Sequence, residues 1–291
     1  MEQSHEHNVA ERIRNRFDQL TRAERQLANA MLENYPISGL GSITAIAERS
    51  NVSTPTVVRM SKKLGFKGFP ELQTALRGEL EARISNPISK HERWTQNAPD
   101  THILNRFADA VMDNLRSTLK QINPETFNAV VDLLSDPTHA IHVVGGRITN
   151  SMAGYFFNHM QVMRSGVTHV ASNSNTWPHY VLNMKAGDIL LAFDIRRYEH
   201  NLLRLAKMAK AKDVTLILIT DQWGSPVAKF ATHSFYTRIM APSAWDSSVI
   251  ILFLVEALIT GVENANWDET KARMNTLEEL FDQTKMFKKF R

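Results

Sequence analysis

The stretch SITAIAERSNVSTPTVVRMSKKLGFK, residues 42–67, decides the fold of the N-terminal part of the chain, because it contains two short helical patterns joined by a corner. In the first pattern, Ile43, Ile46 and Ala47 recur at the spacing of one helix face. The second pattern has an apolar side, which we assign to Val57, Val58 and Leu64. Residues 50–53 separate the two patterns, and this is the length of a helix-turn-helix corner.

The second helix has the composition of a recognition helix. Ser53 suits its N-cap, because its hydroxyl can accept an unpaired amide of the first turn, and Pro55 suits that turn because no intrahelical donor is lost. From Ser53 to Pro70 there are four Lys or Arg residues and no Asp or Glu. We therefore predict that this helix begins with a slim polar end for the major groove and continues into cations that hold phosphates. The predicted DNA-contacting residues are Ser53, Thr54, Pro55, Thr56 and Arg59, of which all but Pro55 face base edges, and Lys62, Lys63 and Lys67, which face phosphates.

A plainer interpretation is a helical hairpin with a solvated basic face. The cap, the corner length, the apolar period and the charge all agree, and this agreement favours the DNA-binding interpretation.

Composition sets the outer limits. The 291 residues are enough for two domains, and the formal net charge of +4 is too small to indicate nucleic-acid binding without the local charge described above. There are no cysteines, which excludes disulfides, thiolate metal sites and thiol catalysis. The N-terminus lacks an apolar signal segment, and the apolar run 249–262 contains Glu256 and is too short to span a bilayer. We expect a cytoplasmic protein with no membrane partner.

The segments around the corner also predict helices. Residues 9–34 have a helical pattern that includes the capping-box sequence Thr21-Arg22-Ala23-Glu24, and Gly65 suits a C-terminal cap of the second helix. Residues 85–100 contain two prolines and no sustained apolar period, which is typical of a linker. The predicted division is a helix-turn-helix domain at 1–84, a linker at 85–100 and a second domain at 101–291.

Residues 101–121 predict an amphipathic helix. This helix can bridge the domains, pair with its copy in a dimer, or pack within its own domain. Its apolar side consists of Ile103, Leu104, Phe107, Val111, Leu115 and Leu119.

From His139 onward, short apolar runs alternate with helical patterns. This alternation predicts βαβ units and a parallel sheet covered on both faces, so the fold class of this part is a three-layer αβα domain. The predicted strands are Ala140–Val144, Val167–Ala171, Asp188–Phe193, Val214–Thr220 and Ser234–Tyr236, and the predicted helices between and after them are 150–164, 176–184, 199–211, 225–231 and 244–261.

Ligands in such sheets bind beyond the carboxyl ends of the strands. Residues 145–150 follow the first strand and lead into a helix, where exposed amides favour an anion; the alternative is a plain strand-to-helix turn. After the third strand, two adjacent arginines could grip a phosphate or carboxylate; the alternative is a salt-bridge cluster. The candidate effector-binding residues are Gly145, Gly146, Arg147, Thr149, Asn150, Ser172, Asn173, Asp194, Arg196, Arg197 and Tyr198.

No pattern indicates a metal or a cofactor. The histidines show no metal-binding spacing, and the sequence contains no GxSxG, Walker or GxGxxG motif.

Two stretches resemble a known family, the RpiR-type transcription regulators. Residues 9–84 resemble its helix-turn-helix domain, and residues 125–262 resemble the sugar isomerase (SIS) domain that follows it. The first resemblance depends on Thr21-Arg22-Ala23-Glu24-Arg25-Gln26-Leu27-Ala28, Ile46-Ala47, Val52-Ser53-Thr54-Pro55-Thr56-Val57-Val58-Arg59 and Lys63-Leu64-Gly65-Phe66-Lys67-Gly68-Phe69.

The resemblance implies a homodimeric or homotetrameric regulator that binds double-stranded DNA and senses a small anionic metabolite, a phosphosugar or a sugar acid, in its SIS domain. Gly145 and Thr149 match the first glycine and the serine of the family's Gly-x-Gly-x-Ser loop, whereas Arg147 replaces the second glycine. The family's Ser-x-Ser-Gly-x-Thr phosphate loop corresponds to residues 194–199, which read Asp-Ile-Arg-Arg-Tyr-Glu. Its hydroxyls are absent here, so an anion would have to be bound in another geometry.

Two alternatives to an effector-controlled regulator stay open. One is a sugar-phosphate isomerase with an accessory N-terminal domain, for which Glu199 and His200 are the candidate general bases. The other is a DNA-binding protein of the nucleoid type without an effector. Our main prediction is a non-enzymatic regulator of sugar or related carbon metabolism.

Overall fold

The computed structural model describes residues 8–96, 101–285 and 287. By its internal contacts this part of the chain forms two compact units. The first unit holds the residues up to Gln121 together with Thr220–Lys229 and Tyr236–Ile250, and the second holds Ile122–Ile219, Phe230–Phe235 and the residues after Ile250. Because each unit combines separate chain segments, the domain boundaries predicted from the sequence remain a prediction.

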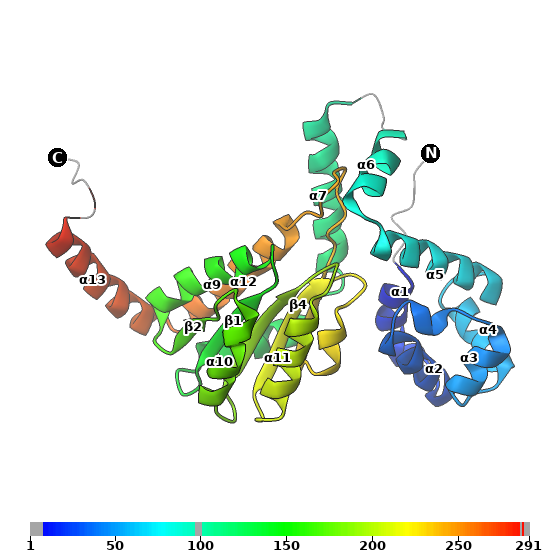
Figure 1. The fold of residues 1–291 in the computed structure, drawn as a ribbon, viewed down its shortest axis with the longest axis horizontal. Helices are drawn as coiled ribbons and strands as arrows, with labels where there is room; N and C mark the ends of the chain where they lie inside the picture. The colour runs from blue at the N-terminus through cyan, green and yellow to red at the C-terminus, as the bar shows by residue number, and fades with distance from the viewer. Residues whose placement is uncertain (1–7, 97–100, 286, 288–291) are drawn as a thin grey trace. The chain divides into compact units, whose positions relative to one another are not determined.

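The N-terminal residues form a succession of short helices, shown in blue and cyan in Figure 1. The helical pattern predicted over 9–34 is confirmed as two helices, and the second begins at the predicted capping box of Thr21. The side chain of Asn8 accepts the backbone N–H of Glu11, and that of Thr21 accepts the N–H of Glu24. The helices and 3-10 turns are α1 (Val9–Asn15), η1 (Phe17–Gln19), α2 (Arg22–Glu33), η2 (Ile37–Gly39), α3 (Ile43–Arg49), α4 (Thr54–Lys63) and α5 (Phe69–Ile84).

The predicted helix-turn-helix corner is confirmed between α3 and α4. Asn51 adopts a φ of 49°, a left-handed conformation that asparagine tolerates better than most residues, and the N–H of Val52 donates to the carbonyl of Ala47 at 2.9 Å. Gly65, with a φ of +90°, ends α4 as predicted, because its N–H and that of Phe66 donate to carbonyls of the last turn. The small core beneath these helices includes Leu27, Ala28, Met31, Ile46, Ala47, Val57, Met60, Leu64, Phe66, Phe69, Leu72 and Leu76.

Two further helices are α6 (Pro87–Gln96) and α7 (Ile103–Leu119). Helix α6 lies within the predicted linker and was not anticipated. It forms because Asn86 accepts the N–H of Ser89 at 2.9 Å and Pro87 occupies a first-turn position, where it lacks no needed donor. Residues 97–100 lie outside the described residues.

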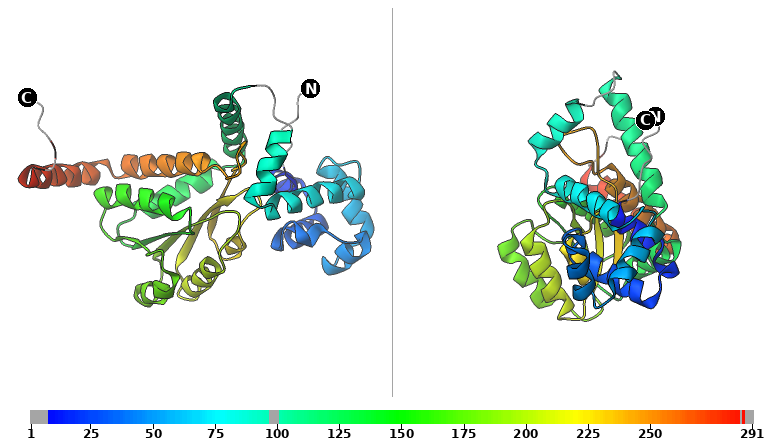
Figure 2. Two further views of the ribbon diagram at one scale, coloured as in Figure 1. Left: turned by 45° about the horizontal axis from the view of Figure 1, so that its top comes forward. Right: turned by 90° about the vertical axis from the view of Figure 1, so that its right-hand side faces the viewer.

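The predicted parallel sheet is confirmed, with five strands in the order β2-β1-β3-β4-β5. β1 pairs in parallel with both β2 and β3, and every residue of β1 and β3 is buried. Figures 1 and 2 show α9 and α12 on one face of the sheet and α10 and α11 on the other. The strands are β1 (Ile141–Gly145), β2 (Val167–His169), β3 (Ile189–Asp194), β4 (Thr215–Asp221) and β5 (His233–Thr237).

The helices of this part are α8 (Pro124–Ser135), α9 (Asn150–Met163), α10 (Trp177–Asn183), α11 (His200–Lys210), α12 (Val249–Ala265) and α13 (Trp267–Thr284). The helix predicted at 225–231 is only a 3-10 turn, η4 (Pro226–Lys229), and the one predicted at 244–261 begins and ends later, as α12. Within the described ranges, no single helix is long and apolar enough to cross a membrane. Helices α12 and α13 meet these criteria only as a pair, and they are bent by 100° at the break between them.

Candidate DNA-binding surface and effector loops

Most of the predicted DNA-contacting residues, on α4 and immediately beside it, are exposed to solvent. Ser53, Pro55, Arg59, Lys62, Lys63 and Lys67 are exposed, and Thr54 is partly exposed. The opposite side packs on the core through Val57, Met60 and Leu64, while Val58 is only partly buried. The outer face therefore combines a polar N-terminal end with cations, the arrangement that a recognition helix requires.

The prediction that Thr56 faces outward toward base edges is wrong. Its side chain is only 4% exposed, and its hydroxyl lies 2.9 Å from that of Ser53. Arg59 Nη2 also donates to Thr56 Oγ1 at 3.1 Å. Ser53 is the N-cap residue, as expected, but its side chain makes no capping hydrogen bond to the backbone. Thr56 thus supports Ser53 and Arg59 from inside.

Lys63 is committed to an ion pair that the sequence did not reveal. Its ammonium lies 2.7 Å from Glu24 Oε2, and the Glu24 side chain is only 3% exposed. Glu24 also accepts the N–H of Thr21 in the capping box of α2. Burial by itself raises the pKa of Glu24, but the hydrogen bonds from Lys63 and Thr21 outweigh it, so that the pKa is lowered. Lys63 therefore ties α4 to α2.

Two arginines from the region of α1, which were not predicted to contact α4, bind the carbonyls at its C-terminal end. Arg16 Nη1 donates to the carbonyl of Lys63 at 2.6 Å, and Arg12 Nη1 donates to the carbonyl of Leu64 at 3.2 Å. Cations are favoured at a helix C-terminus, where carbonyls lack intrahelical partners. No local pattern predicts these contacts, because each joins residues about fifty positions apart in the sequence.

The predicted effector loops come together at the sheet edge. Gly145 of β1 pairs with Phe193 of β3, so the loops that follow these neighbouring strands, 145–150 and 194–199, begin side by side. The strand order reverses between β1 and β3, and in open α/β sheets this switch point is where ligands bind.

Loop 145–150 uses two of its predicted ligand groups for its own structure. Thr149 is buried, and its hydroxyl accepts the N–H of Gly146 and donates to the carbonyl of Phe193, both at 2.9 Å. Asn150 Oδ1 lies 3.0 Å from His169 Nε2 on β2. A Cβ on Gly145 would meet the backbone of Thr149 and Asn150 at 2.5 Å, so this close turn requires glycine. Arg147 is exposed.

Loop 194–199 has the backbone of a glycine loop with charged side chains. Arg197 has a φ of 67°, which favours glycine, and it occupies the glycine position of the family's phosphate-loop pattern. Asp194 is 2% exposed and accepts the N–H of Glu199 at 3.4 Å. Arg197 is exposed, and Arg196 and Tyr198 are partly buried.

The third predicted effector loop begins at Ser172 and Asn173, after β2. Ser172 and Asn173 are exposed, and the side chain of Asn173 accepts the N–H of Asn175 at 3.1 Å, a turn-forming bond. Ser174 of the same loop accepts from Asn201 Nδ2 of α11 at 2.8 Å. This loop is therefore linked to the start of α11.

Glu199 also contacts the predicted effector loops, although the sequence suggested a role for it only in the isomerase alternative. Its Oε1 accepts the backbone N–H of Arg147 at 2.7 Å. A carboxylate that is already present at the predicted anion loop changes the charge that an effector would meet.

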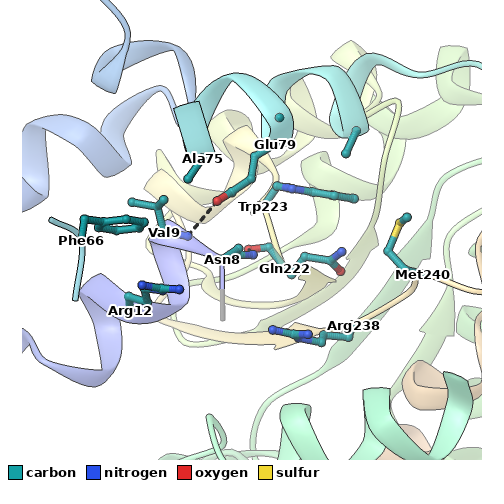
Figure 3. A pocket seen from close by; sticks show the side chains of 12 residues that line it. Asn8, Val9, Arg12, Phe66, Ala75, Glu79, Gln222, Trp223, Arg238 and Met240 are labelled. Carbon is teal, nitrogen blue, oxygen red and sulfur yellow. Dashed lines mark hydrogen bonds between the residues drawn. The ribbon is translucent and has the colours of Figure 1, made fainter. Parts of the chain in front are cut away.

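A separate cavity of about 320 Å³ lies in the first unit, against α1 and α5 (Figure 3). Its lining includes Val9, Arg12, Glu79 and Trp223. The dashed line in Figure 3 joins the N–H of Val9 to Glu79 Oε1, at 2.8 Å, and the hydroxyl of Tyr35 donates to the other carboxylate oxygen. Burial raises the pKa of Glu79 to about 7, even though both hydrogen bonds favour the carboxylate.

Across residues 8–96, 101–285 and 287, no three His, Asp or Glu side chains gather in a way that could hold a metal ion.

Comparison with known proteins gives two domain matches. Residues 7–83 match the helix-turn-helix domain of the rpiR family, and residues 134–261 match the SIS domain. The chain is 26% identical over 273 residues to the HTH-type transcriptional regulator HexR of Pseudomonas aeruginosa, and the alignment covers 88% of this chain and 89% of that protein.

Two solved structures are similar in fold. The sugar isomerase domain of an RpiR transcription factor from Sphaerobacter thermophilus has a TM-score of 0.56 at 20% identity, covering 60% of this chain and 97% of that one. The Vibrio vulnificus NanR protein complexed with ManNAc-6P also has a TM-score of 0.56, at 19% identity, covering 95% of this chain and 99% of that one.

Proposed function

This chain belongs to the RpiR-type transcriptional regulators, which join a helix-turn-helix domain to a SIS domain, and we propose that it regulates genes of sugar or related carbon metabolism in response to an anionic metabolite. We also propose that it acts in the cytoplasm. The observation that supports this function best is the outward face of α4, where exposed cations follow a polar N-terminal end and no acidic residue intervenes.

For the DNA contact, we assign base edges to Ser53, Thr54 and Arg59. Arg59 suits this role because Thr56 holds its guanidinium near the N-terminal end of α4, which is the end of a recognition helix that reaches bases. Lys62 and Lys67 are assigned to phosphates, whereas Lys63 chiefly stabilises the domain through Glu24.

For the effector, we assign the loops that follow β1 and β3. Their position at the switch point and their exposed Arg147 and Arg197 support an anion. The ManNAc-6P bound to the NanR relative supports a phosphosugar. The family's Ser and Thr hydroxyls are absent at positions 194, 196 and 199, and a sugar acid is the other member of this ligand class.

We propose a homodimer or homotetramer that pairs through α7. Half of the predicted apolar side of α7 is exposed, with Leu104 at 68% exposure and Ile103 and Leu119 at 48%, and its other three residues are only partly buried. The buried residues of this helix are instead Asn114, Ser117 and Thr118. An exposed apolar stripe is typical of an interaction surface. A two-fold dimer would read a palindromic site, with half-sites separated by whole turns of the duplex.

In the proposed mechanism, the effector binds one arrangement of the oligomer more tightly and so changes how the two α4 helices are presented. By linkage, DNA must then change the effector affinity by the same factor. Titration of a labelled fragment from the protein's own promoter region, with and without phosphosugars and sugar acids, tests this. Failure to bind any such fragment at low ionic strength would contradict the proposal.

The isomerase alternative has its own test. A coupled assay on ketose and aldose phosphates should show no turnover, and sustained turnover would favour the enzyme. A thermal-shift screen distinguishes the effector-free DNA-binding alternative, because a bound effector raises the melting temperature.

A further inference from the structure

The carboxylate of Glu199 makes a hydrogen bond to loop 145–150 that the proposed function does not explain. Its Oε1 lies 2.7 Å from the backbone nitrogen of Arg147, and a Cβ on Gly146 would come within 2.8 Å of the same oxygen. The carboxylate therefore lies directly on the backbone of loop 145–150, although Glu199 itself belongs to the loop that follows β3.

Glu199 accepts the backbone N–H of Arg147, which takes no part in the hydrogen bonds given above within loop 145–150. The N–H of Gly146 is bound by Thr149 Oγ1, and the N–H of Asn150 donates to the carbonyl of Gly146 at 2.8 Å. The N–H of Arg147 instead points out of the loop, and a backbone N–H with this orientation is a typical anion donor. Glu199 supplies an anion from within the chain.

We propose that Glu199 is a built-in competitor of the anionic effector, so that an anion binds these loops only by displacing the Glu199 carboxylate from the amide of Arg147. This inference rests on the proposed function, namely that the loops after β1 and β3 receive an anion. A phosphate at this amide would otherwise have a second negative charge within a few ångströms, and like charges at such a distance repel strongly. Glu199 thereby selects against weakly bound anions such as free phosphate.

Glu199 lies where displacement of its side chain can affect helix α11. Glu199 is the N-cap residue of α11, and its own N–H donates to the buried carboxylate of Asp194. Release of its side chain thus alters the contact between loop 145–150 and the first turn of α11.

The experiment is equilibrium dialysis of the full-length protein with radiolabelled inorganic phosphate at low ionic strength. Glu199→Gln keeps the shape and an acceptor oxygen but removes the charge, and Glu199→Thr also shortens the side chain. We expect the Kd for phosphate to fall at least about tenfold in Glu199→Gln and further in Glu199→Thr. Glu278→Gln makes the same charge change at an exposed position of α13, and it should leave the Kd unchanged.

Equal Kd values for the wild type and Glu199→Gln would overturn the inference, and so would a failure of both variants to bind phosphate. If Glu199→Gln does not fold, as judged by its melting curve, Glu199→Thr decides alone. Promoter-fragment binding by the wild-type protein without phosphate separates the two proposals. If DNA is bound but the phosphate affinities are equal, only the role of Glu199 fails. If no DNA is bound, the regulatory function fails whatever the phosphate result.

Discussion

Replacing Glu79 by glutamine tests how the N-terminal helices are held together. The Glu79 carboxylate on α5 accepts the N–H of Val9 at the start of α1 and the hydroxyl of Tyr35. Burial raises its pKa from 4.5 to about 7; the nearby charge of Glu11 adds to the increase, and that of Arg12 opposes it. Between these two pH values the folded protein therefore holds a proton at Glu79 that the unfolded chain releases.

The sign and size of the effect follow from proton linkage. Because the folded state binds more protons, the stability of these helices must fall as the pH rises from about 4.5 to about 7. A shift of about 2.5 pH units corresponds to roughly 3 kcal/mol, at 1.36 kcal/mol per unit. Glu79→Gln cannot titrate, so its stability should lack this decline, and its stability relative to the wild type should increase with pH.

Hydrogen exchange of peptides from α1 and α5, corrected for the pH dependence of the intrinsic rates, measures this local stability. Measurements at several values between pH 4 and pH 8 should show the two proteins diverging by roughly 3 kcal/mol. Glu81→Gln is the matched control, because Glu81 is an exposed carboxylate of the same helix. A difference between wild type and Glu79→Gln that stays constant over this range would refute the reasoning.

Three further substitutions test the assignments on α4. Arg59→Ala should weaken specific DNA binding by roughly 1–3 kcal/mol and relax one base position, and an unchanged base preference in a selection assay would count against it. Lys62→Ala should reduce the affinity evenly across sequences and lower the slope of log K against log salt by about 1, as measured by fluorescence anisotropy at several salt concentrations. Lys63→Ala should instead lower the unfolding free energy by about 1 kcal/mol, because Glu24 loses its partner and the 42% exposure of Lys63 already screens part of the attraction. Since the pKa of Glu24 is lowered, this stabilisation is complete above its ordinary value of 4.5 and disappears as the pH falls through the folded-state value, which denaturation at pH 7 and pH 3 would show.

The parts of the fold that the sequence predicts depend on short-range signals. The capping box at Thr21, the corner at 50–53 and the glycine after α4 all act within a few residues, so each can be recognised locally. The strands are recognisable because a parallel sheet buried on both faces requires nearly continuous apolar runs. The sheet then determines which loops meet, since the carboxyl ends of adjacent strands lie together, and this is why the proximity of loops 145–150 and 194–199 could be predicted.

Thr56 shows where pattern reading goes wrong on a helix. A hydroxyl residue reads as polar, yet it can be buried if its hydroxyl has a partner within its own turn. Ser61 does the same on α4, where its hydroxyl donates to the carbonyl of Val57 at 2.8 Å. The buried side of α4 therefore includes Thr56 and Ser61 as well as its apolar residues. The exposed side does not include Thr56.

The chemistry of the proposed effector site depends on contacts that no local pattern contains. Arg197 retains the glycine-like backbone of the loop after β3, so the fold of the site does not depend on the residue types there. The ligand preference depends on them, because Glu199 reaches an amide 52 positions away in the sequence. The residues that replace the family's hydroxyls at positions 194, 196 and 199 therefore include an acceptor, Glu199, that satisfies one of the donors proposed for an anion. A sequence comparison records only the replacement, and the contact appears only once β1 and β3 are paired and their loops are placed together.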